Sequence, residues 1–286
     1  MEENNIKVEE LNEIFSQANQ LIGQVQNDET NPEKKESDEN IDFDLLKLYF
    51  RELYQIETPT KKNIIIKQPT IGDIVEFGEK SFYSTVYVFI TNTTSNRLEL
   101  WYNGIDWNEI TDYDLFLRNF SKINPKVIKY LFEGLDFEAF VPLKHKDDGS
   151  IVLYNTTSDI VIDETVYNHI SQYFRKMFGI SPKVEKTESK VAKEMIIEEE
   201  EFNLLVSKKN SSSSMLLPLI SSCVNHPGFK YKSSELKEVG IFEFMDSTKR
   251  LQVYESATAM LKGMCSGFVD GKKIKEDNYN FMKEIN

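Results

Sequence analysis

Cysteine, glycine and proline are all scarce in this chain, and each shortage argues against a class of protein. Two cysteines among 286 residues cannot form a disulfide scaffold, and so few are typical of a reducing cytoplasm. With 12 glycines and 8 prolines, the composition is neither collagen-like nor that of a loop-dominated all-β protein. No apolar run approaches the roughly 18 residues of a membrane span, so we expect no membrane partner. The acidic N-terminus, MEENNIKVEE, lacks the basic region and apolar core of a signal peptide.

The apolar content is ample for a folded core. Hydrophobic residues make up 40% of the chain and aromatic residues 12%, which excludes global disorder. A length of 286 residues corresponds to one large domain or two small ones. The periodicity of the apolar residues predicts an α+β fold that is mainly α-helical, with a helical body, a small three-stranded antiparallel sheet and a helical C-terminal part.

Negative charge is concentrated at the N-terminus. The chain has a net charge of −13, and residues 1–44 carry 13 acidic and 3 basic side chains. The remainder is close to neutral. An acidic chain repels phosphate backbones, and the basic clusters are short and lack interleaved aromatics, so we expect no nucleic-acid partner.

Residues 1–22 are predicted to form an amphipathic helix, followed by a flexible acidic linker over residues 23–40. The linker contains one aliphatic residue and cannot bury enough surface to offset its conformational entropy. The helix either folds back on its own domain or docks against a partner helix, because a short isolated helix is marginal in water. Its candidate contact residues follow a 3-4-3-4 heptad spacing: Leu11, Ile14, Ala18, Leu21 and Val25.

Residues 41–180 are predicted to form an α+β body. A helix is expected over 42–55 and a strand over 62–68, and helices between 70 and 134 begin with Thr-x-x-Asp capping signals. Gly78, inside the first of these helices, predicts either close packing or a kink. Short β-branched and aromatic segments near 137–163 predict the small sheet. A helix is expected to follow, with Asp163 as its N-cap and Gly179 as its C-cap.

The hydrophilic segment 181–190 suggests a domain boundary before a helical C-terminal region over 191–286. The helix predicted over 191–208 contains the acidic run Glu198–Glu201, which is typical of a solvated face; a site for a cation or a basic partner is the alternative. Two strongly apolar helices are expected over 215–225 and 239–264.

The sequence lacks the usual catalytic signatures. There is no GxGxxG, GxSxG, HExxH or EF-hand pattern, and the glycines of GFVDGKK (267–273) are too close together for a phosphate loop. Cys223 and His226 form a single C-x-x-H pair, whereas structural zinc needs four ligands. We therefore expect no catalytic residues, no metal, no cofactor and no enzymatic activity. Trp101, Tyr102 and Trp107 form an aromatic cluster near a glycine turn, which either packs in the core or forms a recognition surface.

Three stretches together carry a resemblance to a known family. They are IIIKQPTIGDIVEFGEKSFYSTVYVF with LELWYNGIDWNEITDYDLF, the helix end YFRKMFG, and LLPLISSCVNHPGFKY with IFEFMDSTKRLQ. In this order they resemble tail or baseplate assembly proteins of bacteriophages that infect Gram-positive bacteria. The resemblance covers roughly residues 60–286 and excludes the N-terminal segment.

The resemblance implies a non-enzymatic role in building a phage tail. One expectation is an assembly chaperone that holds a helical tape-measure-like client in the host cytoplasm, with Leu11–Val25 and Trp101–Trp107 as candidate contacts. The alternative is a structural component of the baseplate or tail tip that stays in the virion. In both cases the partners would be phage tail proteins.

Overall fold

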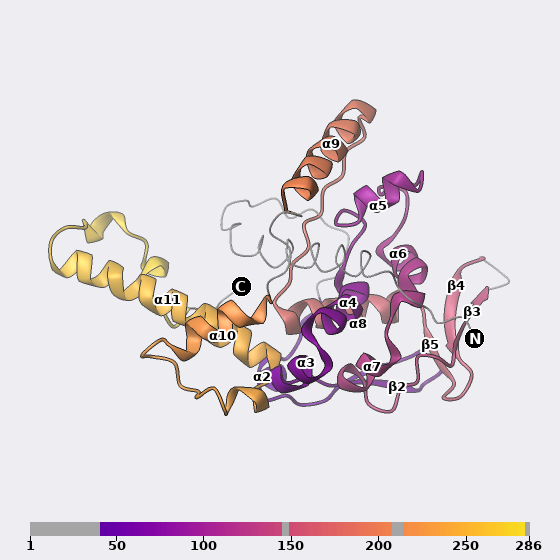
Figure 1. Ribbon diagram of the computed structural model, residues 1–286, viewed down its shortest axis with the longest axis horizontal. Helices are drawn as coiled ribbons and strands as arrows, with labels where there is room; N and C mark the ends of the chain where they lie inside the picture. The colour runs from indigo at the N-terminus through magenta and orange to yellow at the C-terminus, as the bar shows by residue number, and fades with distance from the viewer. Residues whose placement is uncertain (1–40, 145–148, 208–213, 284–286) are drawn as a thin grey trace.

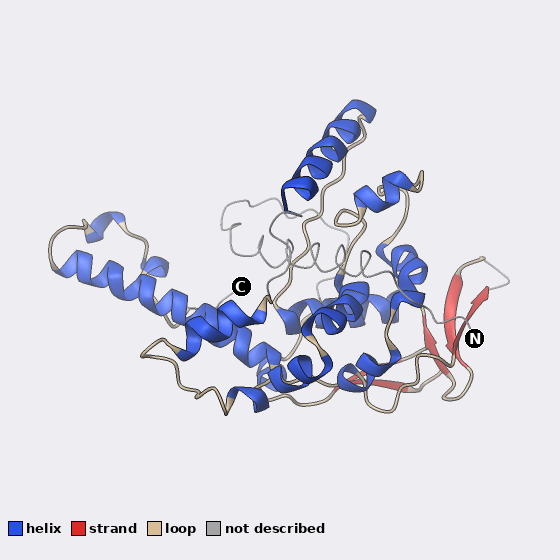
Figure 2. Ribbon diagram, in the orientation of Figure 1, coloured by secondary structure: helices blue, strands red, loops and turns tan. Residues whose placement is uncertain are grey.

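A computed structural model describes residues 41–144, 149–207 and 214–283, and it confirms the predicted mainly helical α+β fold (Figures 1 and 2). Two small antiparallel sheets accompany the helices. The helices are α2 (Leu45–Tyr49), α3 (Ile71–Phe77), α4 (Glu79–Ile90), α5 (Arg97–Tyr102), α6 (Asp112–Asn119), α7 (Pro125–Leu131), α8 (Glu164–Phe178), α9 (Lys190–Ser207), α10 (Leu216–Val224) and α11 (Ile241–Cys265). The strands are β1 (Tyr54–Glu57), β2 (Asn63–Ile66), β3 (Phe140–Lys144), β4 (Ile151–Asn155) and β5 (Ile160–Ile162).

The main core forms around α4 and α8, which pack against each other at the centre of the molecule (Figure 1). Every residue from Phe82 to Ile90 of α4 is buried, and α8 buries eight of its side chains. Aromatic rings fill the space between them and α6, α7 and the sheet. Phe174 lies 5.3 Å from Phe89 and 5.4 Å from Phe132, measured between ring centroids. Burial of this apolar surface is the main stabilising term of the body.

The helix predicted over 42–55 is wrong in its second half. The structure has only α2 there, capped by Asp44, and residues 54–57 instead form β1 against β2, with Ile56 opposite Ile64. Arg51 has a left-handed φ of 60°, so the helix cannot continue. Leu48 is the residue of α2 that enters the core, whereas Leu45, Leu46, Phe50 and Leu53 are exposed.

Gly78 separates two helices where the sequence suggested a single helix. Its φ is 102°, a conformation that a side chain disfavours, and nothing lies within 4 Å of a Cβ placed there. The glycine therefore permits a sharp turn between α3 and α4, and close packing is not its role.

The local capping predictions are confirmed. Thr70 with Asp73 and Thr111 with Asp114 form complete capping boxes at α3 and α6. Asp163 accepts from Val166 N–H at the start of α8, and Gly179 ends that helix in the left-handed conformation. The small sheet also has the predicted topology, in the order β3-β4-β5. Part of its predicted first turn, residues 145–148, falls outside the described residues.

The beginning of α11 is joined to the beginning of α3. Ile71 N–H donates to Val239 C=O at 3.0 Å, and Ile241 N–H donates to Pro69 C=O at 3.0 Å. The backbones approach so closely that a Cβ on Gly72 would lie 2.7 Å from the carbonyl oxygen of Lys237. We call this pairing the α3–α11 seam. It attaches α10 and α11 to the main core.

None of the helices in the described segments combines the length and the apolar character that crossing a membrane requires.

Candidate partner-binding site

Helices α5 and α9 pack together outside the main core and form a projection (Figure 1). The projection has its own small apolar cluster, in which Ile197 is the buried residue of α9. The other buried members are Leu98, Leu100, Trp107 and Leu115, and the partly buried members are Trp101, Ile105, Ile110 and Leu204. Helix α9 therefore packs on α5, although the sequence grouped it with the C-terminal helices.

The predicted aromatic residues lie in this projection but have different environments. Trp101 and Trp107 are 6.1 Å apart between ring centroids. Trp107 is only 1% exposed and offers no surface to a partner, so packing is its role here. Tyr102 is 66% exposed, and its hydroxyl donates to Glu201 of α9 at 2.5 Å. The other predicted contact residues, Leu11, Ile14, Ala18, Leu21 and Val25, lie outside the described residues.

Ion pairs orient α9 on the projection. The guanidinium of Arg97 lies 2.8 Å from Glu185 Oε2 and 2.6 Å from Glu200 Oε1. Lys193 pairs with Asp106 and lies 5.5 Å from the centroid of the Trp107 ring. The acidic run of α9 is therefore divided: Glu200 is paired with Arg97, whereas Glu198 and Glu199 are exposed, as a solvated face predicts.

The two carboxylates beside Arg97 have opposite pKa shifts. The hydrogen bond from Arg97 lowers the pKa of Glu185 below its usual value. Burial raises the pKa of Glu200, because desolvation disfavours its charged form more than Arg97 favours it. Arg97 therefore contacts two carboxylates whose charged forms it favours, but only for Glu185 does this outweigh the cost of burial.

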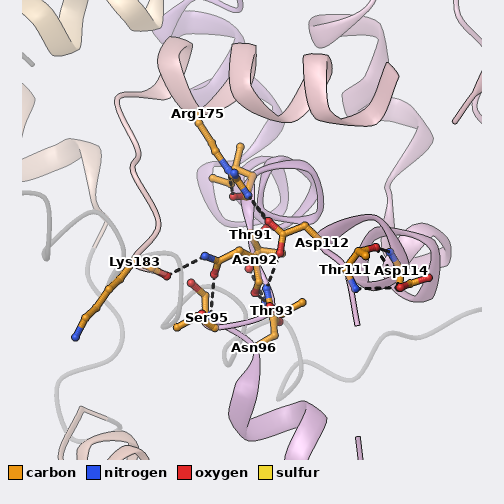
Figure 3. Close-up of polar contacts among 12 residues, drawn as sticks. Thr91, Asn92, Thr93, Ser95, Asn96, Thr111, Asp112, Asp114, Arg175 and Lys183 are labelled. Atoms are coloured by element: carbon orange, nitrogen blue, oxygen red, sulfur yellow. Dashed lines mark hydrogen bonds and ion pairs between the residues drawn. The ribbon is translucent and has the colours of Figure 1, made fainter. Parts of the chain in front are cut away.

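The projection joins the body at a buried polar neck, residues 91–96, of sequence TNTTSN (Figure 3). Arg175, which comes from α8, donates to the carbonyls of Ile90 and Thr91 at 2.8 and 3.0 Å, and to Asp112 Oδ2 at 3.1 Å. The other oxygen of Asp112 accepts from Thr93 N–H at 2.9 Å. These bonds satisfy backbone groups that would be costly to bury without partners.

The neck also joins the two chain segments that lead to the projection. Asn92 Nδ2 donates to Lys183 C=O at 2.8 Å, and Glu185 N–H donates to Thr94 Oγ1 at 3.1 Å (Figure 3 shows the first). Asn108 Nδ2 likewise donates to Thr187 C=O at 2.6 Å. The segment between α8 and α9 is therefore fixed to the segment between α4 and α5. The run of polar residues is the only sequence signal of this neck, and it is equally typical of an exposed loop.

Helix α9 carries a second apolar stripe on the side turned away from Ile197. Its members are between 49% and 66% exposed: Val191, Met195, Phe202, Leu205 and Val206. We call these residues the exposed face of α9. Val191, Met195, Phe202 and Leu205, together with Glu198, follow a 4-3-4-3 spacing, which is the pattern of a coiled-coil seam, and Val206 extends the stripe beside Leu205. The stripe is not evident from the sequence because the acidic run interrupts it.

The described residues offer little for metal or nucleophilic chemistry. They contain no group of three or more His, Cys, Asp or Glu side chains placed to hold a metal ion. Cys223 is buried with its sulfur 3.4 Å from Thr248 Oγ1, whereas His226 contacts Glu255 at 3.1 Å. The two members of the C-x-x-H pair therefore have separate partners.

Comparison with known proteins gives one match. A family model described as the second domain of YomV matches residues 208–286, a segment whose first six residues lie outside the described part. The match covers α10, α11 and the α3–α11 seam residues Val239 and Ile241, but neither α5 nor α9. No curated protein and no solved structure matches the chain. YomV is encoded in a phage region of Bacillus, so the similarity is consistent with a phage protein.

Proposed function

We propose that the protein is a phage tail assembly chaperone that binds a helical, tape-measure-like client through the exposed face of α9. The observation that carries the proposal is this face itself. Single exposed apolar residues are normal on a protein surface, but five on one side of one helix are typical of an interaction site. The similarity of residues 208–286 to a YomV domain supports the phage setting.

The spacing of the exposed face suits a helical partner. A 4-3-4-3 stripe is complementary to another helix with apolar residues at heptad positions, because side chains of one helix fill the holes of the other. The exposed carboxylates Glu194 and Glu199 flank the stripe, and the exposed carboxylate of Glu198 lies within it. We therefore expect a client segment that flanks its apolar residues with Lys or Arg.

The attachment of α9 suits a binding role because it is rigid where it meets the body. Arg97 and Lys193 form ion pairs that join α9 to the projection, and the neck residues Asn92 and Thr94 bond the segment that leads into the helix. A preorganised surface loses less conformational entropy on binding than a mobile one. A client would therefore meet a preformed helix rather than order one.

A binding experiment with matched variants tests the proposal. Fragments of the tape-measure protein of the same phage are titrated against the full chain, against Phe202→Glu and against Phe268→Glu. Phe202 is 65% exposed on α9, and Phe268 is 91% exposed after α11, so both substitutions alter surface residues. We expect at least tenfold weaker binding for Phe202→Glu and unchanged binding for Phe268→Glu. Equal loss in both variants, or no binding by any tail protein, would contradict the proposal.

Mass spectrometry of purified particles addresses the structural alternative. A chaperone acts in the host cytoplasm during assembly and leaves the particle, so only trace amounts are expected in mature virions. A fixed number of copies in each particle would instead identify a component of the baseplate or tail tip.

A further inference from the structure

We infer that the N-terminal segment of the same chain covers the exposed face of α9 when no partner is bound. The part of the segment that would pack on this face is its apolar stripe, Leu11, Ile14, Ala18, Leu21 and Val25. This inference goes beyond the proposed function and does not depend on it, because the segment can cover α9 whether or not the face also receives a client.

The two stripes match in length and period. The N-terminal stripe extends over residues 11–25 with a 3-4-3-4 spacing, and the stripe on α9 extends over residues 191–205 with a 4-3-4-3 spacing. Each corresponds to about 22 Å of helix at 1.5 Å per residue. A helix as short as the N-terminal one gains stability mainly from an apolar surface on which to pack. The exposed face of α9 supplies such a surface.

The middle residues of the two stripes are also complementary in size. Ala18 is the middle residue of the N-terminal stripe, and Glu198 is the middle residue of the stripe on α9. The 3-4-3-4 stripe places Ala18 at an a position and the 4-3-4-3 stripe places Glu198 at a d position, so these two residues meet in an antiparallel pair, where a positions pack beside d positions. The small alanine leaves room for the methylene groups of Glu198 to lie along the apolar seam while its carboxylate stays in water.

The charges permit the pairing. Residues 11–25 contain one charged side chain, Glu13, and their polar positions are mainly Asn and Gln. Amide side chains donate hydrogen bonds to carboxylates, so they tolerate the neighbouring Glu194 and Glu199 without charge repulsion. The strongly acidic residues of the N-terminal region lie mostly outside this stripe.

The chain can reach α9 from its first described residue. Ile41 N–H donates to Gln172 Oε1 at 3.1 Å, which places the end of the predicted linker on α8. The 15 residues 26–40 span at most about 50 Å when extended. Measured along the chain, the start of α9 lies at most about 50 Å from Gln172, if six residues are helical and the next twelve are extended. The tether therefore allows contact, and it raises the effective concentration of the segment to the millimolar range.

Site-directed disulfide formation tests the inference in the full chain. Ala18→Cys is combined with Glu198→Cys, in a background where the exposed Cys265 is replaced by serine; the remaining Cys223 is buried. The matched control combines Ala18→Cys with Asn203→Cys, because residue 203 is exposed about 140° around the same helix. Mild oxidation is followed by peptide mapping and by measurement of the mass of the intact protein.

We expect the Ala18–Glu198 pair to cross-link within one chain at least ten times faster than the control pair. Adding Ile14→Lys and Leu21→Lys should abolish this difference, because lysines disrupt the apolar stripe without altering the tether. Equal rates in the two pairs would overturn the inference. Cross-linking mainly between two chains would also overturn it, and would identify a second copy as the occupant.

The result is separable from that of the client experiment. Selective cross-linking with no client binding would leave the inference intact and contradict the proposed function. Client binding that depends on Phe202, without selective cross-linking, would support the proposed function and overturn the inference about the N-terminal segment.

Discussion

The main core and the α5–α9 projection are stabilised in different ways. In the core, α4 and α8 are surrounded by closely spaced aromatic rings, and apolar burial dominates. In the projection, five buried side chains form the apolar cluster, and ion pairs and a polar neck fix its orientation. One helix therefore has two apolar sides in different environments: Ile197 packs in the cluster that attaches α9 to α5, whereas the exposed face lies outside that cluster.

Both tryptophans of the chain, Trp101 and Trp107, lie in the projection. Their fluorescence therefore reports on the projection, whereas far-UV circular dichroism reports on the helices of the whole molecule. Together the two signals measure whether a substitution affects one region or both.

The largest expected effect comes from removing a ring at the centre of the main core. Phe174→Ala should lower the free energy of unfolding by about 3–5 kcal/mol, because it leaves a cavity among Phe89, Phe132 and Phe178. Urea unfolding should show this loss both in tryptophan fluorescence and in far-UV circular dichroism. Phe268→Ala, at a side chain that is 91% exposed after α11, is the control and should stay within about 0.5 kcal/mol of the unsubstituted protein. A similar loss in the control would mean that the loss in Phe174→Ala does not come from a cavity in the main core.

The neck should show the next largest effect. Arg175→Met keeps the apolar stem but removes the bonds to Ile90, Thr91 and Asp112, for an expected cost of about 2–4 kcal/mol. Urea unfolding measures this loss in the free energy of unfolding. Lys176→Met, at the neighbouring exposed position, should change stability by less than about 0.5 kcal/mol. Comparable losses from the two substitutions would exclude a special role for the neck.

Loss of apolar contact within the projection should have a local effect. Ile197→Ala should cost about 2 kcal/mol, at the low end for a buried isoleucine because the cluster is small and lies at the molecular surface. The tryptophan fluorescence transition should move to lower urea, while the main circular dichroism transition moves little. Coincident shifts of both transitions would show that the projection and the core unfold as one unit.

The smallest effect concerns the two carboxylates at Arg97. Since the pKa of Glu185 is lowered in the folded state, its stabilising contribution is present above its ordinary pKa near 4.5 and is lost as the pH falls through the lowered value. Since the pKa of Glu200 is raised, its charge opposes folding at neutral pH, and this penalty disappears as the pH falls through the raised value.

At pH 7, Glu185→Gln should therefore destabilise the projection by less than about 1 kcal/mol, and Glu200→Gln should be neutral or slightly stabilising. Fluorescence-monitored unfolding at pH 7 and pH 4 measures the difference, which should shrink at the lower pH. The opposite order of the two variants at pH 7 would contradict the opposite directions of the two pKa shifts.

Local features could be predicted from the sequence, and contacts between distant segments could not. The capping boxes at Thr70 and Thr111 depend on residues three positions apart, so the pattern was sufficient. The helix predicted over 42–55 was wrong because β1 depends on pairing with β2 and on the backbone turn at Arg51. Tertiary pairing overrode the local helical pattern.

The candidate site could be predicted only in part, for the same reason. The aromatic cluster was identified, but the burial of Trp107 depends on α9, whose Lys193 is 87 residues away from its partner Asp106. The bond between Arg175 and Asp112 joins residues 63 positions apart and has no local signature. The exposed face of α9 has a sequence pattern, but which side of the helix is covered depends on where α5 packs.

The α3–α11 seam also has a consequence for the timing of synthesis. Gln68 accepts from Phe242 N–H at 3.1 Å, and these residues are 174 positions apart. At about 5–20 residues per second, a ribosome needs roughly 10–35 s to make the chain between them. During that interval the nascent chain contains the start of α3 but not the start of α11. The groups around Ile71 that α11 buries in the folded protein therefore stay uncovered until the C-terminal region has been made.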